Sequence, residues 1–176
     1  MKNILVIGTG TIGEPLIGLL ADYSKKIKIK NVFFHKRTPL VDEVAKVNSM
    51  IRKGAKLVVD EDCVEAFQNL GHEPILHFKA ALDLADVVID CTPSGNENKE
   101  KFYQPLLEQR FCANNDKKRV FIAQGSEKGF GTPFAHGIND EILATDPNFI
   151  QVVSCNTHNI ASLLKALSSD SFYNVI

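Results

Sequence analysis

The segment that decides the fold of this chain is Ile4-Leu5-Val6-Ile7-Gly8-Thr9-Gly10-Thr11-Ile12-Gly13. Its four leading apolar residues predict a buried strand, and the apolar residues after Pro15 predict a helix. Between them, Gly8 permits a tight turn, Gly10 lets a pyrophosphate approach the backbone, and Gly13 lets helix and strand pack together. This context predicts a dinucleotide site, with the phosphates at the helix N-terminus. The alternative is a glycine-rich turn in another α/β fold.

The composition excludes several classes of protein. The 176 residues suffice for one domain with a sizeable core. The formal net charge of -1 gives no bulk attraction to nucleic acid or to a membrane surface, so we expect neither as a partner. No apolar run is long enough to span a bilayer.

The cysteines are widely spaced, at Cys63, Cys91, Cys112 and Cys155. Because no C-x-x-C pair is present, we expect no metal site and no disulfide framework. The first residues lead directly into a strand, so we expect no signal peptide. Together these features predict a chain of the reducing cytoplasm.

The rest of the chain alternates strand and helix patterns, which predicts an α/β fold. We expect a Rossmann-type, doubly wound, mostly parallel sheet with helices on both faces. Further strands are predicted at 31–35, 56–59, 75–76, 87–91, 119–123 and 149–153, and helices at 40–52, 60–70, 78–84, 96–110, 136–143 and 160–167. The segment 127–133 is too irregular to assign.

The residues after the second strand bear on which dinucleotide binds. An Asp or Glu at this strand end would accept hydrogen bonds from the ribose of NAD, and the sequence has none there. Lys36, Arg37 and Thr38 would instead suit the 2′-phosphate of NADP. We therefore expect NADP, with NAD as the alternative, unless these residues form only a solvated turn. Thr92 and Pro93 follow a later buried strand, at the edge where such sheets bind ligands.

Cys155 is the candidate nucleophile. It lies between a predicted strand and a predicted helix, where a helix N-terminus stabilises a thiolate. Beside a nicotinamide, such a thiolate suits aldehyde oxidation through a thioester. The alternative is a small buried apolar side chain, which is the interpretation that we favour for Cys91.

Several segments taken together resemble phosphorylating glyceraldehyde-3-phosphate dehydrogenase of the archaeal type. They are the glycine loop Gly8 to Gly13, Asp90-Cys91-Thr92-Pro93-Ser94-Gly95, Gln124-Gly125-Ser126-Glu127-Lys128 and Ser154-Cys155-Asn156-Thr157. The resemblance covers nearly the whole chain.

The resemblance implies a reaction in two steps. Cys155 would attack the aldehyde of glyceraldehyde 3-phosphate, hydride would pass to NAD(P), and phosphate would release the thioester as 1,3-bisphosphoglycerate. Ser154 and Asn156 would hold the substrate. Thr11, Ile12 and Gly125 would line the cofactor site. A full-length parent would be a homo-oligomer.

The chain also departs from that family. Members are about twice as long, so we expect residues 1–154 to form the NAD(P)-binding domain and 155–176 to begin a truncated catalytic domain. His158-Asn159 and Ala161-Ser162 replace the usual Thr-Gly and Cys-Arg. His158, three residues after Cys155, is a candidate acid–base or a surface histidine. The alternatives are a non-catalytic NAD(P)-binding module and a semialdehyde dehydrogenase relative.

Overall fold

A computed structural model describes residues 1–112, 118–125 and 127–168. The strands are β1 (Lys2–Ile7), β2 (Ile29–His35), β3 (Lys56–Val59), β4 (Leu76–His77), β5 (Val87–Asp90), β6 (Val120–Ala123), β7 (Thr132–Phe134) and β8 (Phe149–Val152). The helices are α1 (Gly13–Asp22), α2 (Val44–Arg52), α3 (Val64–Asn69), α4 (Phe78–Leu84), α5 (Gly95–Asn98), α6 (Gln104–Cys112) and α7 (Cys155–Leu167). Short turns of 3₁₀ helix are η1 (Val41–Glu43), η2 (Glu61–Cys63) and η4 (Asp140–Thr145), and η3 (Lys99–Tyr103) is a π-helix.

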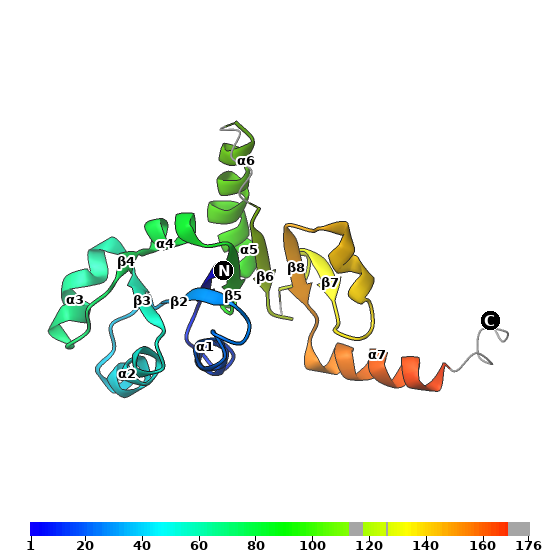
Figure 1. Cartoon of the computed structure of the whole chain (residues 1–176), viewed down its shortest axis with the longest axis horizontal. Helices are drawn as coiled ribbons and strands as arrows, with labels where there is room; N and C mark the ends of the chain where they lie inside the picture. The colour runs from blue at the N-terminus through cyan, green and yellow to red at the C-terminus, as the bar shows by residue number, and fades with distance from the viewer. Residues whose placement is uncertain (113–117, 126, 169–176) are drawn as a thin grey trace.

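The strands form one eight-stranded sheet in the order β4-β3-β2-β1-β5-β6-β8-β7 (Figure 1). Every neighbouring pair in it is parallel. The chain builds outward from β1 to β4, then returns to the other side of β1 at β5. The prediction of a Rossmann-type sheet is therefore confirmed, and β1 and β5 flank the point where the strand order reverses.

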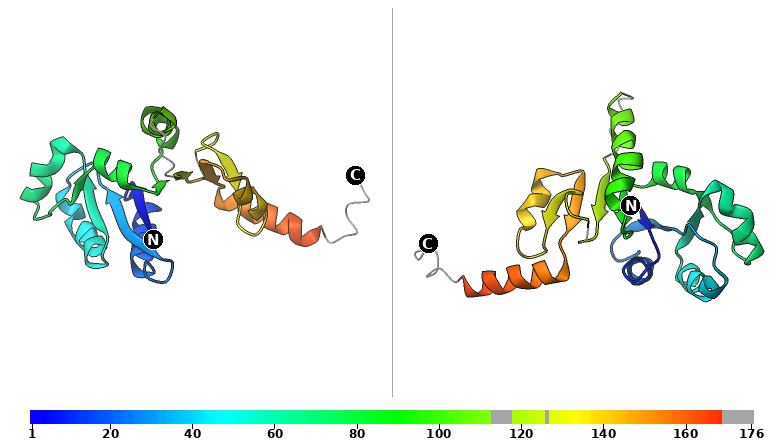
Figure 2. Two further views of the ribbon diagram at one scale, coloured as in Figure 1. Left: turned by 45° about the horizontal axis from the view of Figure 1, so that its top comes forward. Right: turned by 180° about the vertical axis from the view of Figure 1, so that it is seen from behind.

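Both faces of the sheet are covered, as the sequence predicts. Side chains alternate along a strand, so Ile4 and Val6 of β1 face one way and Leu5 and Ile7 face the other. The first pair packs in a core with α1, α2 and α3, and the second in a core with α4 and η3. Figures 1 and 2 show α1 and α2 on one side of the sheet and α4 on the other.

Three segments between β5 and β8 have a secondary structure that the sequence patterns did not predict. The predicted helix 96–110 is interrupted by the π turn η3, which a hydrophobic pattern does not reveal. The unassigned segment 127–133 leads into β7, which contains Pro133 and lies at the edge of the sheet, where proline is tolerated. In place of the predicted helix 136–143, a 3₁₀ turn spans Asp140–Thr145.

Helix α7 begins five residues before the predicted start of 160. Ser154 has extended backbone and its Oγ accepts a hydrogen bond from the Thr157 amide at 3.2 Å, which is an N-cap. The apolar spacing begins only at Ile160, so periodicity missed the first turn. Figures 1 and 2 show α7 leaving the end of β8 and extending away from the sheet. Residues 155–167 of the expected second unit form α7 and residues 169–176 lie outside the described part, so the expected division between 154 and 155 stays a prediction.

Candidate cofactor and thiol site

The parallel strands bring their carboxyl ends to one edge of the sheet, where a cavity of about 420 Å³ lies over β1, β2, β3 and β5. Six of the residues that the sequence singled out line it: Gly8, Lys36, Arg37, Thr38, Thr92 and Pro93. Residues from three separate segments thus meet at the reversal of strand order, where open α/β sheets bind ligands.

The glycine loop has the backbone that its spacing predicts. Gly8 has a φ of +91°, a left-handed conformation that favours glycine. A Cβ on Gly13 would lie 2.0 Å from the Gly8 carbonyl oxygen, so α1 packs directly on the turn. A Cβ on Gly10 would meet no described atom within 4 Å. The loop therefore leaves open space beside Gly10, as close approach of a phosphate requires. Thr11 and Ile12 are exposed and do not line the cavity.

The cations at the end of β2 differ in their surroundings. Lys36 is buried and its Nζ lies 2.5 Å from Glu43 Oε2. Lys46 binds the other oxygen of Glu43 at 2.7 Å, and the two lysines lower the pKa of Glu43 through these hydrogen bonds. Arg37 and Thr38 are exposed in the cavity wall. The charge of Lys36 is thus compensated within the fold, whereas Arg37 forms no ion pair among the described residues.

Sequence reasoning missed the carboxylate in this wall. Asp60, just beyond β3, lies in the cavity with its Oδ1 3.1 Å from Nε2 of His35, the last residue of β2. Burial lowers the pKa of His35, and Asp60 opposes that shift. The sequence pattern predicts a ribose-binding acid only at the end of β2. The parallel pairing of β2 with β3 brings the end of β3, and with it Asp60, alongside that position. A signal was present, because Asp60 directly follows a predicted buried strand.

Further cavity residues come from the glycine loop, from α4 and from the helical segment after β5. The sequence analysis did not select them: they are Thr9, Phe78, Ser94, Glu97, Asn98, Lys101 and Phe102. The ring centroids of Phe78 and His35 lie 4.5 Å apart with the rings tilted by 40°, and Phe78 lies edge-on to Phe102 at 5.2 Å. These rings give one side of the cavity an apolar surface of the kind that ligand pockets use.

The predicted thiol site lies farther along the same edge. Between β1 and β8 the sheet has β5 and β6, which at strand spacing places the two strand ends about 14 Å apart. Cys155 is exposed at the first position of α7, and Asn156 is exposed beside it. A Cβ on Gly125 would lie 2.4 Å from the Ser154 amide nitrogen, so Gly125 packs against this helix start and does not line the cavity.

Two side chains near Cys155 are held by the fold. The Ser154 hydroxyl caps α7, and it also lies 2.9 Å from the Thr157 hydroxyl. The ring of His158 bonds through Nε2 to the carbonyl oxygen of His136 at 3.0 Å. Both groups therefore have a structural partner in addition to any role toward a substrate.

The other thiols have different surroundings. Burial raises the pKa of Cys91 to about 12, with a further contribution from Asp90, and its Cβ lies 3.4 Å from the position of a Cβ on Gly13. Burial also raises the pKa of Cys63. Cys91 is thus a packing residue beneath the glycine loop. The side chain of Cys112 lies outside the described part.

Neither a metal centre nor a membrane-spanning helix is found in the described part of the chain. Among residues 1–112, 118–125 and 127–168, no cluster of His, Cys, Asp and Glu is arranged to hold a metal ion. Within the same residues, no helix has the length and apolar character to cross a membrane.

The sheet, the glycine loop and the cavity at the strand reversal define a Rossmann-type α/β domain. The chain is 31% identical over 169 residues to glyceraldehyde-3-phosphate dehydrogenase of Pyrobaculum calidifontis, covering 95% of this chain and 44% of that protein. It is 31% identical over 176 residues to the enzyme of that name from Methanothermus fervidus, covering 98% and 46%. The match to the Archaeoglobus fulgidus protein of the same name is 31% over 170 residues, covering 96% and 45%. No protein-family model matches the chain.

These similarities, with the fold, identify the chain as an N-terminal domain of the glyceraldehyde-3-phosphate dehydrogenase family of oxidoreductases. The chain spans less than half the length of the curated relatives it matches.

Proposed function

We propose that this chain binds NAD(P) at the carboxyl edge of its sheet and is the cofactor-binding part of a glyceraldehyde-3-phosphate dehydrogenase. The observation that carries the proposal is the open space at Gly10, beside a tight turn at Gly8 and a close contact at Gly13. The start of α1 has no side-chain cap from the described residues. The Glu14 amide already donates to the Gly10 carbonyl oxygen at 3.0 Å and Pro15 has no amide hydrogen, so an anion there would be bound by amides of the glycine loop itself.

The adenosine end of the cofactor belongs in the cavity over β2 and β3. Arg37 would bind a 2′-phosphate there, because it is exposed at the end of β2 and free of ion pairs among the described residues, whereas Lys36 is paired with Glu43. Asp60 is the competing acceptor, of the type that binds ribose hydroxyls in NAD sites. We propose NADP as the preferred cofactor on the strength of Arg37.

Cys155 is proposed as the nucleophile that forms the thioester with glyceraldehyde 3-phosphate, with Ser154 and Asn156 near the substrate. The bound nicotinamide supplies the hydride acceptor. The thiol is exposed at the first turn of α7, where a helix N-terminus favours an anion. For a longer parent protein we propose glyceraldehyde 3-phosphate and phosphate as substrates. We also propose that this parent protein is a homo-oligomer.

Calorimetric titration of the chain with NADP⁺ and with NAD⁺ tests the first proposal. We expect binding of both, with NADP⁺ bound more tightly. The variant Arg37→Ser should weaken NADP⁺ binding about tenfold and leave NAD⁺ binding nearly unchanged, because a single charged contact is lost. Absence of binding at millimolar cofactor would contradict the proposal, and equal loss for both cofactors would contradict the role of Arg37.

The pair Gly10→Ala and Gly13→Ala separates the binding role of the loop from its folding role. Gly10→Ala places a methyl in open space, so thermal stability should not fall while NADP⁺ affinity drops about tenfold or more. Gly13→Ala drives a methyl onto the Gly8 carbonyl and should cost about 1–3 kcal/mol of stability or more. Full affinity in Gly10→Ala would remove the main support for the proposal.

The non-catalytic module is distinguished by assay of a protein that contains this chain together with the remainder found in its relatives. If this protein turns over glyceraldehyde 3-phosphate and the Cys155→Ser variant does not, the result supports the interpretation as an enzyme. Cofactor binding without turnover supports the module.

A further inference from the structure

The π turn η3 changes which side chains of its helical segment face β5. Asn98 and Tyr103 are five residues apart, and in an α-helix they would lie about 140° apart around the axis. A turn with i→i+5 hydrogen bonds brings such residues to nearly the same side. Here the Asn98 amide and the Tyr103 hydroxyl donate to the same atom, Asp90 Oδ2, at 2.8 and 2.6 Å.

The other oxygen of Asp90 binds the loop that follows β5. Asp90 Oδ1 accepts from the amide of Thr92 at 2.9 Å and from its hydroxyl at 2.6 Å. Asp90 is fully buried, and a buried carboxylate is tolerated only with such a set of donors. The carboxylate therefore ties the helical segment on one side to the loop on the other.

This loop adjoins the glycine turn in the cavity wall. Cγ2 of Thr92 lies 3.0 Å from the position of a Cβ on Gly8, and Gly8, Thr92 and Pro93 all line the cavity. The Thr92 hydroxyl also accepts the amide of Ser94 at 3.2 Å. Thr92 is thus the residue of this loop that contacts the glycine turn, and its hydrogen bonds to Asp90 fix its position.

We propose that Asp90, Asn98 and Tyr103 are positioning residues that hold the Thr92–Pro93 wall at the separation from the glycine turn that nucleotide binding requires. The inference rests on the proposed function of the cavity as a nucleotide site. Asp90 and Tyr103 are fully buried and do not line the cavity, so they act through Thr92.

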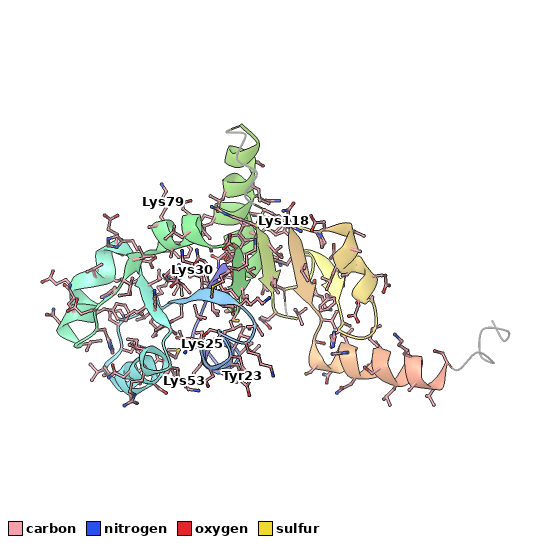
Figure 3. The ribbon with its side chains drawn as sticks, viewed as in Figure 1. Tyr23, Lys25, Lys30, Lys53, Lys79 and Lys118 are labelled. Atoms are coloured by element: carbon pink, nitrogen blue, oxygen red, sulfur yellow. The ribbon has the colours of Figure 1, made fainter. Side chains whose placement is uncertain are left out.

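Tyr103→Phe isolates the hydrogen bond from the packing. The Tyr103 ring stacks on Phe121 at 4.8 Å and lies edge-on to Phe130 at 6.3 Å, contacts that phenylalanine keeps. The hydroxyl that donates to Asp90 is the atom removed. A matched control is Tyr23→Phe, because Tyr23 is half exposed at the end of α1 (Figure 3). A second control is Val47→Ala, which weakens the core on the other face of the sheet.

The first measurement is amide hydrogen exchange in the protein without nucleotide, and the second is calorimetric affinity for NADPH. In Tyr103→Phe the amides of Thr92 and Ser94 should exchange about tenfold faster, and NADPH should bind about tenfold more weakly, since a hydrogen bond to a charged group is lost. Tyr23→Phe should change neither. Val47→Ala should lower the melting temperature and leave the affinity within about twofold.

Unchanged exchange at Thr92 and Ser94 would overturn the proposal, and so would faster exchange with unchanged affinity. An equal loss of affinity in Val47→Ala would overturn it as well, because stability alone would then account for the effect. If the unmodified chain binds no NADPH, the proposed function fails, and the exchange rates alone decide whether Asp90 and its donors hold the loop.

Discussion

Two helices that begin at the carboxyl edge of the sheet, α1 and α7, have opposite relations to the core. Helix α1 starts at Gly13, packs on the Gly8 turn and buries Ile17 completely. Helix α7 starts at Cys155 and has no buried residue, although Ile160, Leu163, Leu164 and Leu167 are spaced as an apolar stripe. The nucleotide end of the proposed site is therefore anchored by core packing, whereas the thiol end is held by a cap, by its attachment to β8 and by side-chain hydrogen bonds such as that from His158 to the His136 carbonyl.

The largest expected difference between these regions is in thiol reactivity. A pKa of about 12 leaves Cys91 at neutral pH with about a thousandth of the thiolate of an ordinary thiol, so iodoacetamide should label it about a thousandfold more slowly than free cysteine. Cys155 is exposed and should be labelled first. Peptide mapping by mass spectrometry at limiting reagent measures both rates. Labelling in urea provides the control, because all cysteines should then react alike. Rapid labelling of Cys91 in the folded protein would refute the packing described for it.

Matched truncations in the two helices should differ by several kcal/mol. Ile17 is 0% exposed, and Ile17→Ala should lower the free energy of unfolding by about 2–5 kcal/mol. Leu163 is 64% exposed, and Leu163→Ala should change it by no more than about 0.5 kcal/mol. Urea denaturation at two protein concentrations measures both. A large, concentration-dependent loss in Leu163→Ala would show that α7 packs against a second copy in solution.

The smallest expected effect is a pH dependence that arises in the packed region. Burial lowers the pKa of His35 and of His72 from 6.5 in the folded state. The unfolded chain then binds more protons as the pH falls below about 6.5, so stability should decline from there toward the lowered folded pKa values. His72→Leu should reduce this decline, because it removes a buried ring whose Nδ1 has no partner among the described residues. The free energy of unfolding of both proteins at pH 7.5 and 5.5 tests this prediction. If His72→Leu loses as much stability between these pH values as the unmodified chain, His72 does not contribute to the pH dependence.

Sequence patterns predicted the packed region well because its signals are local. The strand, the glycine spacing and the helix of residues 4–22 lie within one segment, and the structure reproduces the turn at Gly8 and the contact at Gly13. Asp60 was missed because its neighbour His35 is adjacent only through pairing of β2 with β3. The sequence did not predict that Asn98 and Tyr103 both donate hydrogen bonds to Asp90, because this arrangement depends on a π turn.

The thiol region was predicted less completely for a related reason. The sequence places Cys155 between a strand and a helix, and the structure places it there. That the Ser154 hydroxyl caps α7 depends on backbone geometry, which residue types alone do not fix. The roles of Cys155, Ser154 and Asn156 toward a substrate stay predictions.

The position of β8 between β6 and β7 has a consequence for the order in which the sheet is assembled during synthesis. Strand β7 leaves the ribosome before β8, yet within the sheet its pairing is to β8. Until residues 149–152 emerge, β6 presents an open backbone edge, the kind of surface that invites pairing with another chain. Arrival of β8 closes that edge and gives β7 its partner in one event. The sheet edge nearest the thiol is therefore the part of the sheet whose strands are synthesised last.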